Sequence, residues 1–425
     1  MRRPTSSSTR CAPSPKSSPD GTPMTSSKVP ITRPALGDAE VEAASRVIRS
    51  GWITQGPEVA AFEADYGAAV GAPHAVAVTN CTVALELALR VVGVGAGDEV
   101  ITVSHSFVAT ANAIVALGAK PVFCDVTEDT FGMDPTKLER LIGPRTKAIM
   151  PVHQMGMPCR IGAIVAIAEA RGIPVVEDAA CAVGSEIRVD STWERIGRPH
   201  GALACFSLHP RKIITTGDGG IITTRSEELA KRMRLLRQHA MSIPDTVRHH
   251  SDKVVFEDYT EPAFNYRMTD LQAAVGRPQI ARLGAIVAER RKLADRYVER
   301  LAASCTVSTP VEADGHRSNW QSYPLRLKDG VRVTQVEALQ HLMDRGIAGK
   351  RGISNAHQEK AYVGKSTWSC GPDDSPACHQ GHCVHLSVSE KLRDTTILIP
   401  LFHGMTAAEQ DRVVDALLEL DTLHA

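Results

Sequence analysis

Short apolar runs alternate with helical patterns through the first two thirds of the chain. The runs have the length of β-strands and are apolar at nearly every position; they lie at 74–78, 98–103, 120–126, 146–152, 173–178, 202–208 and 221–224. Between them, residues 82–94, 109–118 and 161–172 have the composition of buried helices. Continuously apolar strands separated by helices are typical of a parallel sheet. The pattern therefore predicts an α/β fold, a mostly parallel sheet covered by helices on both faces.

The pattern changes after residue 270. Residues 280–301 predict a long amphipathic helix, and the strand-like segment "WQSYPLRL" and two further helical segments follow. We expect a large α/β domain at 31–276 and a smaller α+β C-terminal domain at 277–425. A helix within 31–50 is expected to pack on the smaller domain or on a partner subunit. Residues 1–30 are rich in Ser, Pro and Thr, which predicts a disordered tail.

The composition of the chain limits the kinds of molecule that it is expected to bind. The chain has 48 Lys and Arg against 48 Asp and Glu, so a formal net charge of zero gives no reason to expect nucleic acid or an anionic membrane. No apolar run approaches the roughly 20 residues of a membrane span, and the N-terminus lacks the apolar core of a signal peptide. Cys124 and Cys205 lie inside apolar strand-like runs, as free thiols do in a reducing compartment. We expect a cytoplasmic protein that acts on small molecules.

The segment "CFSLHPRKIITTGDGG", residues 205–220, holds the first candidate for chemistry. Its β-branched residues 213–216 and the Asp-Gly turn predict a loop that feeds a hairpin, with Lys212 where the loop meets the strand. Most lysines are simply solvated surface residues. A lysine kept partly out of water loses hydration, so its pKa falls and it becomes an amine nucleophile. The segment alone leaves both interpretations open.

Further candidates follow the ends of the predicted strands, where open α/β sheets bind ligands. Thr82 begins a helix, which provides either an anion site or an ordinary N-cap. Phe107 follows the next strand, where it either covers a planar ligand or belongs to the core. Asp178 ends an apolar strand, where a carboxylate is costly without a cationic partner, unless it caps a helix.

Together these residues supply a phosphate site, an aromatic face, a carboxylate and an amine at one sheet edge. Pyridoxal 5′-phosphate requires all four. The carboxylate would keep the pyridine nitrogen protonated, so that the ring can take up electrons when an α-proton leaves. Lys212, once displaced by the substrate amine, is then the natural base for that proton.

The segment "ACFSLHPRKIITTGDGGIITT" closely resembles the Ser-x-His-x-x-Lys…Thr-Thr-Gly-Glu-Gly-Gly signature of the DegT/StrS family of sugar aminotransferases, which have pyridoxal-phosphate fold type I. Four further blocks, "VVEDAACAVGSE" among them, are similar to the family and stand in family order over roughly residues 30–422. The resemblance implies that Lys212 carries the cofactor, that Asp178 pairs with its pyridine nitrogen and that Phe107 stacks on its ring.

The same resemblance implies the contacts to the phosphate. It assigns them to Cys81 through its backbone N–H, to Thr82 and Ser207, and to Asn265 of the neighbouring subunit. The chain is therefore expected to form a homodimer with shared active sites. Cys181 stands where the family usually has Gln or His near the ring hydroxyl, and a thiol is a weaker hydrogen-bond partner.

Residues 349–362 correspond to the family segment that borders the substrate opening. They include Lys350, Arg351, Asn355 and His357, and we expect substrate contacts from Arg351 and His357. Cations suit a diphosphate, although a solvated loop explains the Lys350–Arg351 pair equally well. Arg267 is an alternative, as the group that binds the carboxylate of the amino donor.

The resemblance implies transfer of an amino group from an amino acid, by family habit L-glutamate, to a keto-sugar. We expect a nucleotide-linked sugar in amino-sugar or antibiotic biosynthesis, with a keto-cyclitol as the alternative acceptor. Lys212 is retained where the family's dehydratases carry His, which favours amino transfer. A regulator that binds the cofactor without turnover is the competing class, and the intact Lys212, Asp178 and Ser207 weigh against it.

A third possibility is a zinc-binding interaction module within residues 368–386. This segment contains Cys370, Cys378, His379, His382, Cys383 and His385. Their spacing matches no compact finger with paired Cys-x-x-Cys knuckles. We therefore expect a flexible loop without a metal.

Overall fold

The computed structural model describes residues 28–243, 253–254 and 256–423. Residues 1–27 of the predicted disordered tail lie outside the described residues. The prediction is wrong at the end of that tail, because Val29 is buried and pairs with Ile347. Its N–H donates a hydrogen bond to the carbonyl of Gly346 at 2.9 Å, and its side chain joins the core of the small domain.

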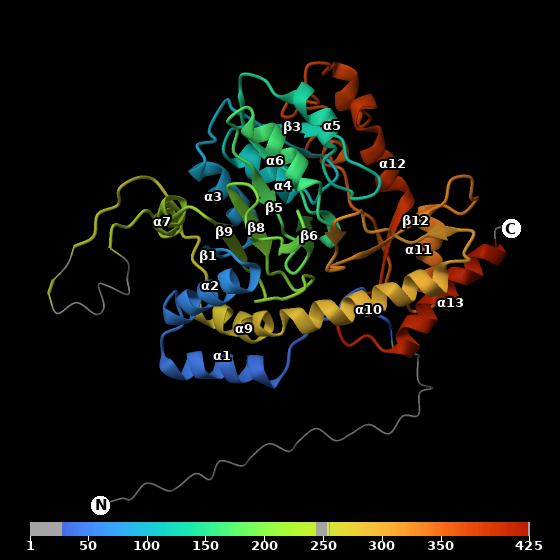
Figure 1. Cartoon of the computed structure of the whole chain (residues 1–425), viewed down its shortest axis with the longest axis horizontal. Coiled ribbons are helices and arrows are strands. Elements are labelled where there is room, and N and C mark those ends of the chain that lie inside the picture. The colour runs from blue at the N-terminus through green and yellow to red at the C-terminus, as the bar shows by residue number, and fades with distance from the viewer. Residues whose placement is uncertain (1–27, 244–252, 255, 424–425) are drawn as a thin grey trace, which may run out of the picture.

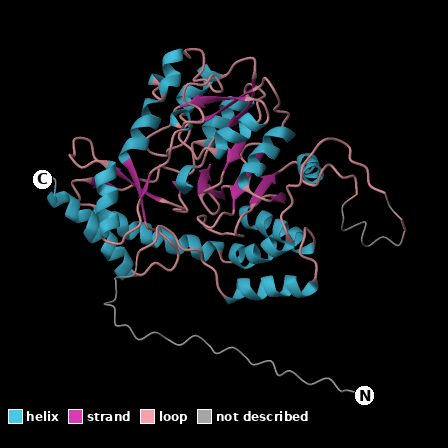
Figure 2. Ribbon diagram, turned by 180° about the vertical axis from the view of Figure 1, so that it is seen from behind, coloured by secondary structure: helices cyan, strands magenta, loops and turns pink. Residues whose placement is uncertain are grey.

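A mostly parallel sheet forms the centre of the large domain (Figures 1 and 2). Its strands are β1 (His74–Val78), β2 (Glu99–Val103), β3 (Lys120–Cys124), β4 (Thr146–Met150), β5 (Val176–Asp178), β8 (Leu203–Ser207) and β9 (Gly220–Thr224). They run in the order β1-β9-β8-β5 and then β4-β2-β3, with parallel bridges between Ile149 and Val175 and between Val152 and Asp178 joining the two groups. β9 is antiparallel to both neighbours, whereas β5–β8, β2–β3 and β2–β4 are parallel.

Helices cover both faces of this sheet, as the sequence predicts. On one face lie α2 (Pro57–Val70), α6 (Ile161–Glu169) and α9 (Asp270–Ala281); on the other lie α3 (Cys81–Val91), α4 (Ala109–Ala116) and α7 (Glu227–Leu236). Short α5 (Pro135–Leu138) lies between β3 and β4. Alternate strand residues feed the two cores, since Ala77 and Ile221 pack on one face and Val76 and Ile222 on the other.

The small domain contains an antiparallel sheet in the order β10-β12-β14-β13. Its elements are β10 (Val307–Ser308), β12 (Tyr323–Leu327), β13 (Lys350–Arg351), β14 (Thr396–Ile399), α10 (Leu283–Leu301), α11 (Gln335–Asp344), α12 (Ser387–Thr395) and α13 (Ala407–Leu423). A separate small sheet pairs β6 (Glu186–Val189) with β7 (Thr192–Arg195) and with β11 (His316–Arg317). Among the helices of the described residues, none is both long and apolar enough to cross a membrane.

The two domains share a continuous helical connection. The expected boundary at residue 276 falls inside α9, and α10 contributes Leu283 and Ile286 to the core of the large domain but Tyr297 and Leu301 to that of the small one. The N-terminal helix α1 (Asp38–Ser50) packs on this connection through Ala43 and Val47, which contact Ala274 of α9 (Figure 1).

Candidate active site

Lys212 lies inside the loop that joins β8 to β9. The β-branched segment 213–216 does not form the predicted strand, and β9 begins only at Gly220. Hydrogen bonds within the loop replace those of a strand: the Thr215 hydroxyl and the Thr216 N–H both donate to the carbonyl of Leu208, at 2.7 and 3.1 Å. Lys212 is therefore held in a folded loop rather than at the start of a strand.

The Lys212 side chain is surrounded by acidic groups. Its Nζ donates a hydrogen bond to Sγ of Cys181 at 3.0 Å. Burial lowers the pKa of Lys212, but the thiol groups of Cys181 and Cys81 and the Asp178 carboxylate raise it, and the net pKa lies above the ordinary value. The net direction is therefore opposite to the fall that desolvation alone would cause.

Asp178 ends β5 as a buried carboxylate. Only 3% of the residue is exposed, its Oδ2 accepts from the Thr110 hydroxyl at 2.7 Å, and its Oδ1 accepts from the Ala180 N–H at 3.1 Å. The Ser106 hydroxyl lies 2.7 Å from that of Thr110 and extends this network. Burial raises the pKa of Asp178, although the Thr110 bond opposes this. Such a carboxylate is stabilised by a cationic partner, and a protonated pyridine nitrogen fits that requirement.

The N-terminus of α3 lies at the same edge of the sheet. Asn80 is its N-cap and accepts from the Val83 N–H at 3.0 Å, which leaves the N–H groups of Cys81 and Thr82 without intrahelical acceptors. A Cβ on Gly220 would lie 2.5 Å from the Asn80 carbonyl oxygen, so only glycine permits this close approach of β9.

Ser207 reaches the same place through strand register. It pairs with Gly220 across β8 and β9, next to the start of α3. Backbone N–H groups and two hydroxyls, those of Thr82 and Ser207, are therefore gathered at a helix N-terminus. Such a donor set fits a phosphate group.

Phe107 follows β2 with 71% of its surface exposed. It does not belong to the core, which was the alternative interpretation of this position. Its neighbour Ser106 belongs to the hydrogen-bond network of Asp178, so the exposed ring lies one residue from that network. An exposed aromatic face beside a buried carboxylate suits a planar cationic ligand.

Asn265 and Arg267 lie beside β1, near the start of α3. Val78 forms an antiparallel bridge with Arg267, and the Thr79 N–H donates to the Tyr266 carbonyl at 2.8 Å. The Asn265 side chain is exposed, and its Oδ1 accepts from the Arg267 N–H at 3.2 Å.

Lys350 and Arg351 are neighbours on β13, and their side chains leave the strand on opposite faces. Burial lowers the pKa of Lys350, and the nearby charges of Arg211 and Lys212 lower it further. Lys350 and Arg351 are nevertheless both exposed residues of β13. The substrate contact from Arg351 stays a prediction, and the charges of Arg211 and Lys212 near Lys350 make Lys350 the stronger candidate.

His357 does not fit the expected role in substrate binding. It is buried, its Nδ1 lies 2.6 Å from the Ser104 hydroxyl, and its Nε2 lies 3.0 Å from Oε1 of Glu390. Asn355 is also buried, with its Oδ1 2.9 Å from Nδ1 of His105. Both residues hold the segment after β13 against the end of β2.

Three residues near the site were not identified from the sequence: Thr110, Asn319 and Gln321. Thr110 could have been identified, because it follows Phe107 in the first turn of a helix that begins at a sheet edge. Asn319 and Gln321 gave no signal, because their contacts cross the two domains. Nδ2 of Asn319 donates to the carbonyls of Cys181 and Val183, both at 2.8 Å. Nε2 of Gln321 donates to the carbonyl of Arg211, also at 2.8 Å.

A buried ion pair lies next to Asp178 on β5. Oε2 of Glu177 is 3.0 Å from Nε2 of His153, and both side chains are fully buried. Burial lowers the pKa of His153, but Cys159 and Glu177 outweigh it and raise that pKa to about 10. Burial alone would raise the pKa of Glu177; bonds from His153 and His200 instead hold it well below its usual range. The pair fixes the backbone that carries Asp178.

A mostly parallel sheet that brings a loop lysine, a buried carboxylate and a helix N-terminus to one edge defines a pyridoxal-phosphate-dependent enzyme of fold type I. The sequence profile of the DegT/DnrJ/EryC1/StrS aminotransferase family matches residues 34–418. The chain belongs to this family and is a pyridoxal-phosphate-dependent aminotransferase.

Individual relatives agree with this assignment. The spore coat polysaccharide biosynthesis protein SpsC of Bacillus subtilis (strain 168) is 39% identical over 317 residues, which cover 74% of this chain and 80% of that protein. The aminotransferase TlmJ from Streptoalloteichus hindustanus superimposes with a TM-score of 0.81 at 31% identity, covering 93% of this chain and 99% of that one. Spr1654 from Streptococcus pneumoniae, solved in its PLP-form, has a TM-score of 0.82 at 26% identity, with 93% and 99% covered.

These findings confirm the predicted family, the fold class, the enzyme class and the cofactor. The family also confirms the general activity, amino transfer; among the relatives, SpsC is named for polysaccharide biosynthesis and Spr1654 is described as a putative sugar aminotransferase. The roles of individual site residues stay predictions.

Proposed function

We propose that this protein transfers an amino group from an amino acid, L-glutamate by family habit, to a keto-sugar, with Lys212 as the covalent anchor of the cofactor and the base. The observation that carries the proposal is the meeting of Lys212, Cys181 and Asp178 at one sheet edge, with Nζ of Lys212 3.0 Å from the Cys181 thiol.

The surrounding residues have distinct parts in this proposal. Asp178 would hold the pyridine nitrogen, and the Thr110 hydroxyl would fix the orientation of its carboxylate. The Cys81 N–H, Thr82 and Ser207 would hold the phosphate, and Phe107 would cover one face of the ring. When bound, pyridoxal phosphate supplies an electron sink for the carbanion left by α-proton removal.

Lys212 would carry the proton between its Nζ and the substrate carbon. Lys212 would act as this base in its neutral amine form, which it would have once the substrate amine has displaced it from the cofactor. Cys181 is near enough to Nζ to keep it oriented. We expect Cys181 to act as such a neighbour and not as a nucleophile.

Three observations favour a sugar carrying a nucleoside diphosphate. SpsC is named for polysaccharide biosynthesis. Lys350, Arg211 and Lys212 are near enough to act on one another electrostatically, which gives a local excess of positive charge. Arg267 adds a further cation beside α3. A guanidinium or ammonium group matches phosphate oxygens well. A keto-cyclitol without phosphate is the alternative acceptor.

We also propose a homodimer with shared sites in which Asn265 serves the neighbouring subunit. Its exposed side chain and the exposed apolar residues of α1, Val41 and Ile48, support an interface near this edge. An exposed apolar surface of this kind is typical of a subunit contact.

The anchor is tested by reducing the holoenzyme with borohydride and mapping the labelled peptide. The label is expected on Lys212, and a label on Lys350 or any other lysine contradicts the assignment.

The substrate is tested with the enzyme in its amine form. Nucleotide keto-sugars, a keto-cyclitol such as scyllo-inosose and simple 2-oxo acids are added separately, and the return of the aldehyde form is followed by absorbance. Fast turnover with 2-oxo acids alone contradicts the sugar proposal, and preference for the cyclitol supports the alternative.

Two variants separate the neighbouring cations of β13. Lys350→Ala should raise KM for the nucleotide sugar and leave the glutamate half-reaction almost unchanged, because only the sugar carries a diphosphate. Arg351→Ala is the matched control and should resemble the wild type. Equal damage to both half-reactions by Lys350→Ala would show a structural role.

A further inference from the structure

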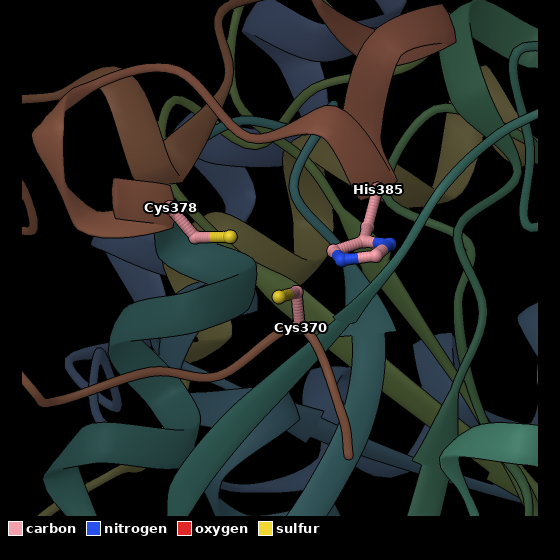
Figure 3. Close-up of side chains that lie close together, drawn as sticks. All are labelled: Cys370, Cys378 and His385. Atoms are coloured by element: carbon pink, nitrogen blue, oxygen red, sulfur yellow. The ribbon is translucent and has the colours of Figure 1, made fainter. Parts of the chain in front are cut away.

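Two cysteines and a histidine of the small domain point toward one another in a segment that the aminotransferase reaction does not use (Figure 3). Sγ of Cys370, Sγ of Cys378 and a ring nitrogen of His385 all lie within 4.8 Å of one another. They come from different places: Cys370 follows the bridge between Ser369 and Val122, Cys378 lies in η4 (Pro376–Gln380), and His385 lies in η5 (Val384–Leu386).

Cys383 is a candidate for the fourth ligand. It is a buried free thiol that stands two residues before His385, at the N-cap of η5. The three cysteines are buried and His385 is half-buried. All three sulfurs are free thiols in the structure, so no disulfide accounts for their closeness.

The other two histidines of the segment have separate partners. Nε2 of His379 lies 3.1 Å from both carboxylate oxygens of Asp374, and Nδ1 of His382 pairs with Glu390. Asp374 also accepts from the Cys370 thiol at 3.4 Å, which places a carboxylate directly behind the cluster. Hydrogen-bonded carboxylates of this kind orient ligand groups in metal sites.

We propose that Cys370, Cys378, Cys383 and His385 bind one structural zinc ion. Three thiolates and one imidazole form a recognised tetrahedral zinc ligand set, and soft sulfur ligands disfavour magnesium or calcium. Zn–S bonds of about 2.3 Å place neighbouring ligand atoms about 3.5–3.8 Å apart, so the ligand atoms of Cys370, Cys378 and His385, which already lie within 4.8 Å of one another, need only small side-chain movements. Four protein ligands leave no open position for a water molecule.

The position of the site gives it a structural role. Residues 352–386 connect β13 to α12 with only short 3₁₀ helices, and long connections of this kind need an added constraint. The zinc would tie the far part of this connection together, next to Trp368, which packs on Phe123 of β3. The same connection supplies Asn355 and His357, which contact the end of β2 just before Phe107.

The spacing alone did not indicate this site, because the ligands are not arranged as paired knuckles. The fold instead brings Cys370 against a turn that carries the other three. The structure therefore supports a metal site where the sequence alone predicts a flexible loop without a metal.

The test measures metal in the full-length holoenzyme, purified without chelators and desalted, by inductively coupled plasma mass spectrometry. We expect one zinc ion per chain in the wild type and at least a fivefold loss in Cys370→Ser and in Cys378→Ser. Cys305→Ser removes an exposed thiol outside the cluster and should retain the metal. Absorbance of the bound cofactor checks that each variant is folded. A wild type without zinc, or cluster variants that keep it, overturns the proposal.

A second measurement covers the case in which the cluster variants do not fold. The wild-type protein is stripped of metal and supplied with cobalt(II) alone, and the thiolate-to-cobalt charge-transfer bands are recorded. Strong bands at one equivalent of cobalt are expected. Absence of these bands, or a disulfide among Cys370, Cys378 and Cys383 found by non-reducing peptide mapping of fresh protein, overturns the site. Both readouts are independent of aminotransferase activity.

Discussion

Replacement of Thr110 by valine tests the proposed role of Asp178 most directly. The Thr110 hydroxyl donates to Oδ2 of Asp178 at 2.7 Å and lies 2.7 Å from the Ser106 hydroxyl, all within a buried network. Valine has nearly the same shape but no hydroxyl. The variant therefore removes one donor from the carboxylate and leaves the packing of α4 almost unchanged.

The expected effect follows from the energy of such a bond. A hydrogen bond to a charged group contributes about 1.5–3 kcal/mol. Since about 1.4 kcal/mol corresponds to a tenfold change in rate, kcat/KM for amino transfer should fall by about 10- to 100-fold. The Thr110 bond also lowers the pKa of Asp178, so its loss should raise that pKa further. A higher pKa means that the carboxylate ionises only at higher pH, and the acidic limb of the rate profile should move upward.

The assay compares kcat/KM against pH for the wild type, Thr110→Val and Thr110→Ser, with cofactor binding followed by absorbance. Serine keeps the hydroxyl, so Thr110→Ser should retain most of the activity and the wild-type acidic limb. The reasoning is refuted if Thr110→Val matches the wild type, or if Thr110→Ser is impaired as strongly as Thr110→Val.

Three further predictions concern the same region. Inactive Lys212→Ala and Asn265→Ala proteins should regain activity when they exchange subunits, because one site of each mixed dimer then keeps both residues; proven exchange without recovery contradicts shared sites. Cys181→Gln, which restores the commoner family residue, should keep measurable turnover, and complete loss with the cofactor still bound would indicate a special role of the thiol. Cys159 and Glu177 raise the pKa of His153 to about 10, so these two contacts stabilise the fold fully below about pH 6.5 and lose this effect as the pH rises toward 10. The free energy of unfolding in urea should fall over that interval in the wild type and much less in His153→Gln; parallel pH dependences of the two proteins would contradict this.

Local patterns were sufficient to predict the sheet and the centre of the site. Each strand of the central sheet of the large domain is a short apolar run with a recognisable end, so Asp178 at the end of β5 and Phe107 after β2 were identifiable from their positions. The helix start at Cys81 was identifiable for the same reason. These features depend on a few neighbouring residues, and tertiary packing did not change them.

Features that depend on distant contacts were predicted incorrectly or missed. The segment 213–216 has the composition of a strand, but its backbone bonds to Leu208 within the loop. The choice between Lys350 and Arg351 depends on which face of β13 meets the large domain, and no local pattern contains that information. His357 was polar and near the expected opening, yet its ring is fully engaged by Ser104 and Glu390.

The amide side chains of Asn319 and Gln321 determine whether a fragment without the small domain can keep an ordered active site. A fragment that ended after α9 would keep Lys212, Asp178 and every proposed phosphate ligand. It would still lose the amides that hold the carbonyls of Cys181, Val183 and Arg211, and the loops bearing the reactive amine and its thiol neighbour would be free to change conformation. Catalytic competence is therefore a property of the undivided polypeptide, and engineering that exchanges C-terminal halves between relatives must carry these two amides with it.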